Sequence, residues 1–273
     1  MARPLPAPLP MVRDLAIDLG TTSISILARN QGIILSEPSA VARVVDTGEV
    51  VAVGSEAARM MGRTPEGLEA LRPLRGGAIT DFESAEGMIR GFLHRVGVRR
   101  LHRPRIVVCV PSFITAVEQR AVREAVHRAG ATEVQLLGYT MAGALGCRLP
   151  LDQPRGSMVV DLGGGTTEAA VLSLGGVVAL EYRRFGGLDL DVDIRDHLRR
   201  HHGVDISLDA AERLKVALGS AASPSHPVDD DPTATVRGRG LRTGTVEEVS
   251  VTATEVADAI HDRVMAIVDA VVA

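Results

Sequence analysis

Hydrophobic and polar positions along this chain predict strands and helices in an order that occurs twice. In the first half, apolar alternation predicts strands at residues 15–28, 32–35, 39–45 and 50–53. A short helix is expected from Ser55, and apolar residues at helical spacing predict a longer helix from Phe82. The inner face of that longer helix would carry Ala85, Met88, Ile89, Phe92, Leu93 and Val96.

A continuous apolar strand at residues 106–110 is expected to end at Pro111, where Ser112 can cap a following helix. Gly130 would end that helix. Its inner face is predicted to carry Val117, Ala121, Ala125 and Val126. A strand at 134–137 and a helix at 141–147 complete the first half.

The same order of elements begins again after a proline-containing segment at residues 149–155. It comprises a hairpin from Met158, a strand at 176–183, helices at 190–202 and 208–218, and strands at 233–237 and 246–251. The spacing of Thr252 and Glu255 is that of a capping box. The last helix would bury Val256, Ile260, Val264, Val268 and Val271. Strands alternating with helices in two successive series favour a two-lobed α/β fold with a boundary near residue 150.

Composition narrows the class of protein. The chain has 273 residues, 45% of them hydrophobic but only 2% aromatic, so Val, Leu, Ile and Ala must build the cores. A net charge of −4 argues against a general nucleic-acid binder. Cys109 and Cys147 lack metal-site spacing and suit a reducing compartment. The alternating prolines of residues 1–10 predict a loose extended arm rather than a signal peptide, and no apolar run is long enough to cross a bilayer.

Two segments of the chain are nearly the same: Leu-Ala-Ile-Asp-Leu-Gly-Thr-Thr at 15–22 and Met-Val-Val-Asp-Leu-Gly-Gly-Gly-Thr-Thr at 158–167. Each reads as a buried strand, an aspartate, a Gly/Thr turn and a second strand. Glycines allow backbone N–H groups to approach an anion, and threonine hydroxyls add donors. Asp18 and Asp161 would hold hydrated Mg²⁺. The phosphate-binding candidates are Gly20, Thr21, Thr22, Ser23, Gly163, Gly164, Gly165 and Thr166. A pair of ordinary glycine hairpins is the alternative.

These segments resemble the two phosphate loops of the actin/Hsp70/sugar-kinase superfamily, and the chain is most similar to the MreB family of bacterial actin homologues. Further similar segments are residues 31–39, 61–65, 72–74, 111–131, 156–161 and 237–241. The resemblance covers residues 12–273 and implies an actin-like (ribonuclease H-like) two-lobed fold. The expected division is an arm at 1–11, a first lobe at 12–150 with a small insertion at about 33–75, and a second lobe at 151–273.

The resemblance also implies a function. ATP and Mg²⁺ would bind between the lobes, with Glu212, Arg213 and Lys215 at the adenosine end. The chain would form filaments with itself or a paralogue, on the inner face of the cell membrane, and organise wall synthesis and cell shape with membrane proteins of that process. The basic segment containing Arg99, Arg100, Leu101 and Arg103 would contact anionic lipid.

Two departures from the family qualify this expectation. Tyr139 stands where the family has a glutamate that positions the hydrolytic water, so weak or absent ATP hydrolysis is expected and no catalytic residue is assigned. The sequence also ends before the family's adenosine loop, which predicts an incomplete second lobe and reduced nucleotide affinity. A non-hydrolysing accessory subunit that co-assembles with a full-length paralogue is therefore the main alternative, and a small-molecule kinase a third.

His197 and His201 lie four residues apart on a predicted helix, with Asp193 on the same side. This spacing is compatible with a metal site. The alternative is that the histidines complement the negative end of the helix dipole.

Overall fold

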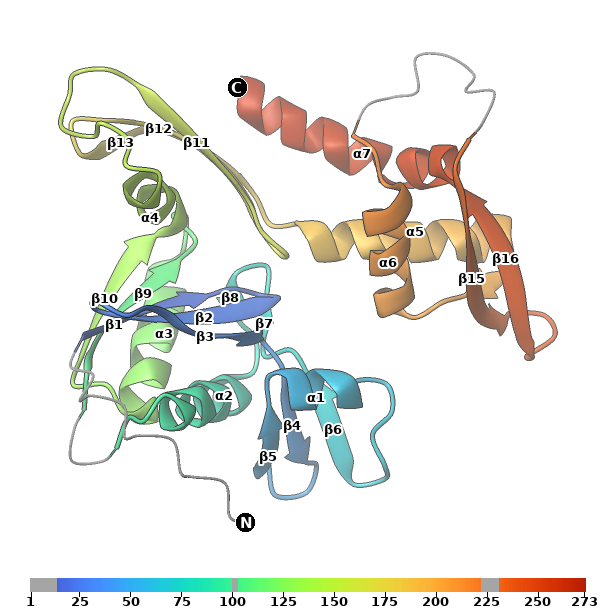
Figure 1. Cartoon of the computed structure of the whole chain (residues 1–273), viewed down its shortest axis with the longest axis horizontal. Helices are drawn as coiled ribbons and strands as arrows, with labels where there is room; N and C mark the ends of the chain where they lie inside the picture. The colour runs from blue at the N-terminus through green and yellow to red at the C-terminus, as the bar shows by residue number, and fades with distance from the viewer. Residues whose placement is uncertain (1–13, 100–102, 222–230) are drawn as a thin grey trace, which may run out of the picture.

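The structure is a computed structural model, and it describes residues 14–99, 103–221 and 231–273. The proline-rich arm, Arg100 and Leu101 therefore lie outside the described residues. The strands of the first lobe's main sheet lie in the order β10-β9-β1-β2-β3 (Figure 1). Their bounds are β1 Asp14–Leu19, β2 Ser23–Ala28, β3 Gly32–Pro38, β9 Arg105–Val110 and β10 Glu133–Gly138. Strands β1, β9 and β10 run parallel, whereas β2 and β3 form antiparallel pairs.

Helices α2 (Phe82–Arg95) and α3 (Ala116–Ala129) pack against each other and cover one face of this sheet. All six residues predicted for the inner face of α2 are buried. They join Leu15, Ile17 and Leu19 of β1 in one apolar core. Alternation therefore places the side chain of Asp18, between Ile17 and Leu19, on the opposite face of the sheet.

The start of α3 differs from the sequence prediction. Its N-cap is Thr115 rather than Ser112, because Thr115 and Glu118 form a capping box that satisfies two backbone N–H groups. The buried face also differs from the prediction: Val117 is 79% exposed, and the buried residues are Val122, Ala125, Val126 and Ala129. Gly130 ends the helix as expected.

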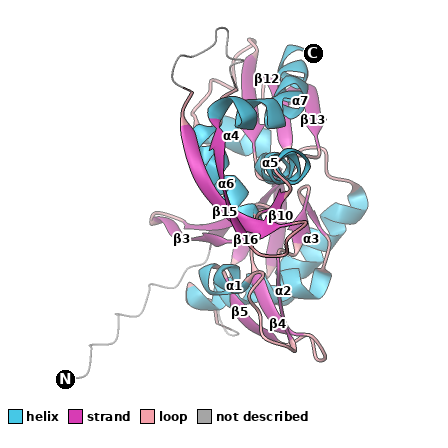
Figure 2. Ribbon diagram, turned by 90° about the vertical axis from the view of Figure 1, so that its right-hand side faces the viewer, coloured by secondary structure: helices cyan, strands magenta, loops and turns pink. Residues whose placement is uncertain are grey.

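A small insertion follows β3. It contains β4 (Val41–Val44), β5 (Val50–Val53), α1 (Ser55–Met60) and β6 (Leu68–Leu71), with the order β5-β4-β6. Figure 2 shows α1, β4 and β5 at the opposite end of the molecule from the C-terminus. A two-stranded hairpin, β7 (Leu74–Arg75) and β8 (Ala78–Ile79), leads from the insertion to α2.

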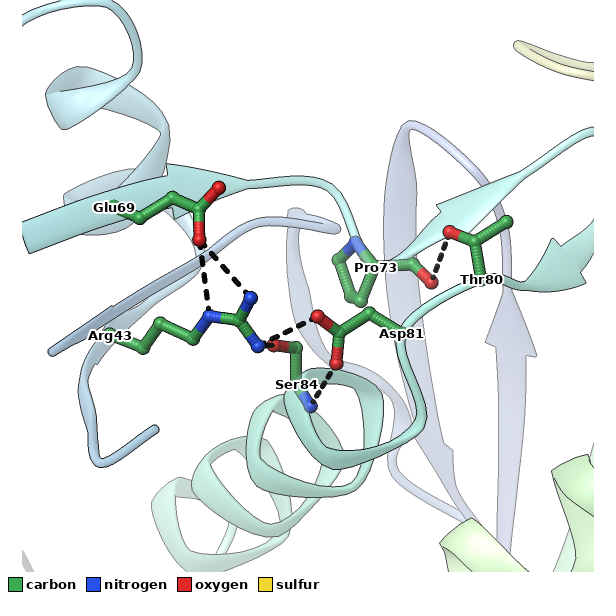
Figure 3. Close-up of polar contacts among 6 residues, drawn as sticks. All are labelled: Arg43, Glu69, Pro73, Thr80, Asp81 and Ser84. Carbon is green, nitrogen blue, oxygen red and sulfur yellow. Dashed lines mark hydrogen bonds and ion pairs between the residues drawn. The ribbon is translucent and has the colours of Figure 1, made fainter. Parts of the chain in front are cut away.

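Arg43 of β4 fixes the insertion to the start of α2 (Figure 3). Its guanidinium donates to Asp81 at 2.7 Å, to the Ser84 hydroxyl at 2.9 Å and to Glu69 at 3.1 Å. Asp81 also caps α2 by accepting the Ser84 N–H at 2.9 Å. The base of the β7–β8 hairpin is therefore held in place, since Asp81 lies two residues after the end of β8.

The second lobe begins with an antiparallel sheet of β11 (Ser157–Leu162), β12 (Thr167–Ser173) and β13 (Gly176–Arg183). Helix α4 (Tyr139–Gly146) contacts β10 as well as β11 and lies between the two sheets (Figure 1). Its Ala144 shares a small core with Ala170 and Leu172 of β12. The division of the chain near residue 150 remains a prediction, because α4 precedes that point and packs on both sides of it.

A further part of this lobe combines β14 (Val204–Asp205), β15 (Thr233–Gly240) and β16 (Val246–Thr252) with three helices. These are α5 (Gly187–His201), α6 (Leu208–Leu218) and α7 (Ala253–Val272). The capping box of Thr252 and Glu255 is confirmed. The predicted inner face of α7 is only partly right: Val256 and Ile260 are buried, but Val268 and Val271 are exposed and Ala270 is buried instead. Helix α7 contacts β12 and β13 as well as β16, α5 and α6.

Candidate functional site

The two glycine turns face each other across a cleft of about 290 Å³. We call residues 20–23, between β1 and β2, loop 1, and residues 163–166, between β11 and β12, loop 2. The lining includes every predicted phosphate-binding residue and both aspartates: Asp18, Gly20, Thr21, Thr22, Ser23, Cys109, Tyr139, Ala142, Gly143, Asp161, Gly163, Gly164, Gly165 and Thr166.

The loops have the same internal geometry and pack closely on each other. The Gly20 N–H donates to the Ser23 carbonyl at 3.0 Å, and the Gly163 N–H donates to the Thr166 carbonyl at 2.8 Å. A Cβ atom at Gly164 would lie 2.2 Å from the Thr22 side chain. Glycine at this position therefore allows the two lobes to approach at the loops.

Helix α5 anchors loop 2 and begins three residues earlier than predicted. The N–H groups of Gly187 and Leu188 donate to the carbonyls of Gly163 and Gly164, both at 2.9 Å. A Cβ atom at Gly186 would lie 2.2 Å from the Gly163 oxygen, so this approach requires glycine.

Asp18 and Asp161 are the last but one residues of equivalent strands in the two lobes and line the cleft from opposite sides. Burial raises the pKa of both carboxyl groups, and the Asp161 charge raises the pKa of Asp18 further. Two desolvated carboxylates that repel each other would be stabilised by a divalent cation. Among the described residues no group of three or more His, Cys, Asp or Glu side chains could hold a metal ion directly. The two carboxylates would suit a hydrated Mg²⁺ that they hold through its water ligands.

Tyr139 and Cys109 form the floor of the cleft. The Tyr139 hydroxyl donates to the Leu19 carbonyl at 2.7 Å, directly below loop 1. Burial raises the pKa of Tyr139 well above its usual value, so the hydroxyl stays protonated and remains a donor. Burial also raises the pKa of the Cys109 thiol to about 11, which leaves it a poor nucleophile at neutral pH.

Glu168 is a buried carboxylate beside the cleft that the sequence did not single out. It follows Thr167 on β12 and accepts the Ser112 N–H at 3.0 and 3.2 Å. Burial raises its pKa, and the bond from Ser112 partly offsets that effect. The Ser112 N–H thus joins the segment after β9 to β12 of the other sheet, and the Ser112 hydroxyl lies 3.0 Å from the Thr140 hydroxyl.

The three residues predicted for the adenosine end lie on α6, but only one contacts the base of the site. The Lys215 ammonium donates to the Gly187 carbonyl at 2.6 Å and lies 2.7 Å from the Asp191 carboxylate. Glu212 and Arg213 are exposed on α6 and do not line the cleft. Lys215 thus ties α6 to the start of α5 and, through it, to loop 2.

Arg99 and Arg103 are the described residues of the basic segment that follows α2. The Arg103 guanidinium donates to the carbonyls of His127, Gly130 and Ala131, at the C-terminal end of α3, at 3.2, 3.2 and 2.9 Å. Arg103 therefore caps the C-terminal end of α3, and its contact with lipid remains a prediction. Arg99 is exposed. Within the described residues, no helix combines the length and apolar character that a membrane crossing requires.

The histidine pair on α5 does not form the metal site that its spacing allows. The His197 and His201 rings stack with centroids 4.3 Å apart, and Asp193 pairs with Arg263 of α7. Burial, together with the His201 charge, lowers the pKa of His197. Among the described residues the pair therefore stacks within α5 and belongs to no group that could hold a metal ion; the alternative, that the histidines complement the helix dipole, remains a prediction.

Two lobes that close on paired Gly/Thr turns, each following a strand that ends in aspartate, define an actin-like protein. Three-dimensional comparison supports this fold. The structure of MreB 5 of Spiroplasma citri bound to AMPPNP superposes with a TM-score of 0.86 at 26% identity, covering 96% of this chain and 78% of that one. A MamK double helical filament shares the fold, with a TM-score of 0.74 at 19% identity over 94% of this chain and 78% of that one.

The family model described as MreB/Mbl protein matches residues 12–273. The cell shape-determining protein MreB of Escherichia coli K12 is 43% identical over 264 residues, which are 94% of this chain and 75% of that protein. The cell shape-determining protein Mbl of Bacillus subtilis 168 is 38% identical, over 94% of this chain and 77% of that protein. The chain belongs to the MreB/Mbl family.

Proposed function

We propose that this chain binds ATP with Mg²⁺ between its lobes. The observation that carries this proposal is the placement of loops 1 and 2 on opposite sides of one cleft, beside Asp18 and Asp161. Backbone N–H groups and hydroxyls of the loops would bind the phosphates, and the two carboxylates would hold Mg²⁺ through its water ligands. The Spiroplasma citri relatives bound to AMPPNP and to ADP support this assignment.

Calorimetric titration of the full chain with ATP, in the presence of Mg²⁺ and then with EDTA, tests the proposal. Saturable binding that weakens when Mg²⁺ is removed is expected. Asp161→Asn should abolish most of the Mg²⁺ effect. A matched control is Asp152→Asn, which changes an exposed aspartate outside the cleft. Absence of ATP binding to the unmodified chain would overturn the proposal.

The cellular role that we propose is that of a cell-shape protein which forms filaments on the inner face of the cell membrane and organises wall synthesis. Its relatives are named cell shape-determining proteins. ATP-driven closure of the lobes would set the contact between successive subunits. The expected partners are copies of this chain or a paralogue, and membrane proteins of wall synthesis.

Membrane association would depend on the basic segment at residues 99–101, since Arg103 caps α3. Arginines near anionic lipid contribute on the order of 1 kcal/mol each. A variant that combines Arg99→Glu with Leu101→Asp should lose flotation with anionic liposomes, whereas Arg103→Ala should keep it. Equal flotation of the double variant and the unmodified chain would contradict this role.

Tyr139 favours a second candidate, a non-hydrolysing accessory subunit that co-assembles with a full-length paralogue. The residue occupies the position of the family's water-positioning glutamate, and its hydroxyl is committed to the Leu19 carbonyl. Sedimentation distinguishes the two candidates. Pelleting of the chain alone with ATP supports an independent filament, and pelleting only in a mixture with a full-length relative supports the accessory role.

A further inference from the structure

Donors from outside the cleft hold the backbone carbonyl groups of loop 1. The Gly20 carbonyl accepts the Ser39 hydroxyl at 2.6 Å. The Thr22 carbonyl accepts the Ser39 N–H and the Arg72 guanidinium, both at 2.9 Å. Neither Ser39 nor Arg72 lines the cleft. These two residues therefore hold the oxygen atoms of loop 1 on the side away from it.

Both donors are fixed by their own surroundings. Ser39 directly follows β3 and is fully buried. Arg72 precedes Pro73, whose carbonyl accepts the N–H of Thr80 at 2.9 Å and its hydroxyl at 3.2 Å (Figure 3). These bonds close the base of the β7–β8 hairpin. The donors that act on loop 1 therefore belong to the rigid connection between the insertion and the main sheet.

The tip of the same hairpin acts on a loop hydroxyl. The Gly77 N–H donates to the Thr21 hydroxyl oxygen at 3.2 Å. Thr21 is 6% exposed, and its hydroxyl proton is left as a donor once the oxygen has accepted this bond. A Cβ atom at Gly77 would lie 2.4 Å from Pro111 and 2.9 Å from Thr166 of loop 2, so the hairpin tip also contacts the other lobe.

Loop 2 reaches the same arrangement with different donors, the N–H groups of Gly187 and Leu188 on the carbonyls of Gly163 and Gly164. The carbonyl of one residue and the N–H of the next belong to one planar peptide group and point in opposite directions. In both loops, a carbonyl that is held on the side away from the cleft therefore directs the N–H of the next residue into the cleft. Among the described residues, no protein acceptor takes the backbone N–H of Thr21, Thr22, Gly164 or Gly165. Four donors are thus left for an anion, and an unsatisfied N–H group gains strongly from a charged acceptor.

We propose that Ser39 and Arg72 are positioning residues for phosphate binding. By holding the Gly20 carbonyl, Ser39 turns the N–H of Thr21, which belongs to the same peptide group, toward the phosphates. Ser39 and Arg72 together hold the Thr22 carbonyl and so fix the peptide group between Thr22 and Ser23. Neither residue touches the nucleotide itself. This inference rests on the proposed binding of ATP in the cleft. Ser39 carries the sharper test, because it bears no charge that could act on the phosphates at a distance.

The experiment compares Mg²⁺–ATP affinity and loop geometry in variants of the full chain. Ser39→Ala and Arg72→Ala remove the donors. Ser55→Ala is the control for the serine, since its hydroxyl donates to Glu37 at 2.6 Å outside the cleft. Arg103→Ala is the control for the arginine, since its guanidinium also binds backbone carbonyls, at the end of α3. Calorimetry measures affinity, and amide chemical shifts of residues 20–23 report loop geometry in the free protein.

We expect ATP binding to weaken about threefold to tenfold in Ser39→Ala, and about tenfold or more in Arg72→Ala, with little change in the controls. The loop 1 amide shifts should move in the first pair alone. Arg72→Lys, which keeps a charged donor, should recover part of the affinity. Ser39→Cys replaces Ser39→Ala if the latter does not fold.

The outcomes separate this inference from the proposed function. If the unmodified chain binds ATP and the Ser39 and Arg72 variants bind it equally well, the positioning role is wrong and ATP binding stands. If the unmodified chain fails to bind ATP, the phosphate assignment of the cleft is wrong. The amide shifts are measured without ATP and so test the loop separately. Unchanged loop 1 amide shifts in Ser39→Ala would reject the proposed orientation of the loop, whether or not the chain binds ATP.

Discussion

The Arg184 guanidinium forms two hydrogen bonds with the Glu118 carboxylate, at 3.0 and 3.2 Å, and joins the end of β13 to the start of α3. Arg184 also lies over the Phe113 ring, 4.9 Å from its centroid, and Phe113 stacks on Tyr182 at 3.9 Å. These contacts connect the two lobes beside the cleft. The bond from Arg184 lowers the pKa of Glu118 to about 2.

Removing this connection should loosen the lobes without disturbing either core. Glu118→Gln keeps the capping box, since glutamine also fits that position, but removes the charge that binds Arg184. We expect the free energy of unfolding to fall by about 1 kcal/mol. The effect is no larger because the Arg184 side chain is 42% exposed, and solvent weakens the ion pair. Thermal unfolding at neutral pH measures it. Glu124→Gln is the control, because Glu124 pairs with Arg128 within α3 and joins no lobes. Equal effects of the two substitutions would contradict a connection between lobes.

Lowering the pH should break the ion pair between Arg184 and Glu118 over a defined pH range. Because the folded pKa of Glu118 is below its ordinary value of 4.5, its contribution is complete above pH 4.5 and is lost as pH falls toward about 2. The difference in unfolding temperature between Glu118→Gln and the unmodified chain should therefore shrink across this range. A difference that stays constant down to pH 2 would show that the carboxylate charge is not the cause.

Asp161 should have opposite effects on stability and on ligand binding. Burial raises the pKa of Asp161 in the folded chain. The charged carboxylate therefore lowers the free energy of unfolding. This loss is absent below the ordinary pKa of 3.8 and develops as the pH rises through the folded pKa. At neutral pH, Asp161→Asn should stabilise the free chain by less than about 1 kcal/mol, a rise of about 1–3 °C in unfolding temperature. It should also weaken the Mg²⁺-dependent part of ATP binding. A variant that is both less stable and binds normally would contradict the assignment.

The sequence predicted the centre of the site because its signal is local and duplicated. Asp18 with loop 1, and Asp161 with loop 2, each lie within one short segment, and repetition makes the pattern specific. The bounds predicted for α6 and β13 are confirmed: Ser207 and Gly219 flank α6, and a pair of glycines, Gly175 and Gly176, marks the start of β13.

Contacts between distant segments could not be predicted in this way. Ser39 and Arg72 lie 19 and 50 residues from the carbonyls that they bind, and Arg184 lies 66 residues from Glu118. A buried serine or a surface arginine has no periodicity that identifies its partner. The start of α3 was different: the spacing of Thr115 and Glu118 is a local capping-box signal, and it could have corrected the assignment to Ser112.

Gly186 should be indispensable to the anchoring of loop 2. In Gly186→Ala the new methyl group would meet the Gly163 oxygen at 2.2 Å, and backbone atoms have little room to shift. We expect a loss of about 1–3 kcal/mol and weaker ATP binding, measured by thermal unfolding and calorimetry. Gly146→Ala is the control, because it lies at the exposed end of α4 with nothing within 4 Å of its new methyl group. Gly146→Ala should be neutral or slightly stabilising. Similar losses in both variants would indicate a general effect of the added side chain.

Restoring a carboxylate at position 139 should raise ATP hydrolysis. A water-positioning group contributes a factor of about 10² to 10⁴, and the Tyr139 hydroxyl supplies no base because burial keeps it protonated. Tyr139→Glu should therefore increase phosphate release at least about tenfold over the unmodified chain, while Tyr139→Gln, which has the same shape without the charge, should not. Circular dichroism checks that both variants fold, since each also loses the bond to the Leu19 carbonyl. Phosphate release by the unmodified chain at the rate of a relative that carries the glutamate would show that Tyr139 does not impair hydrolysis.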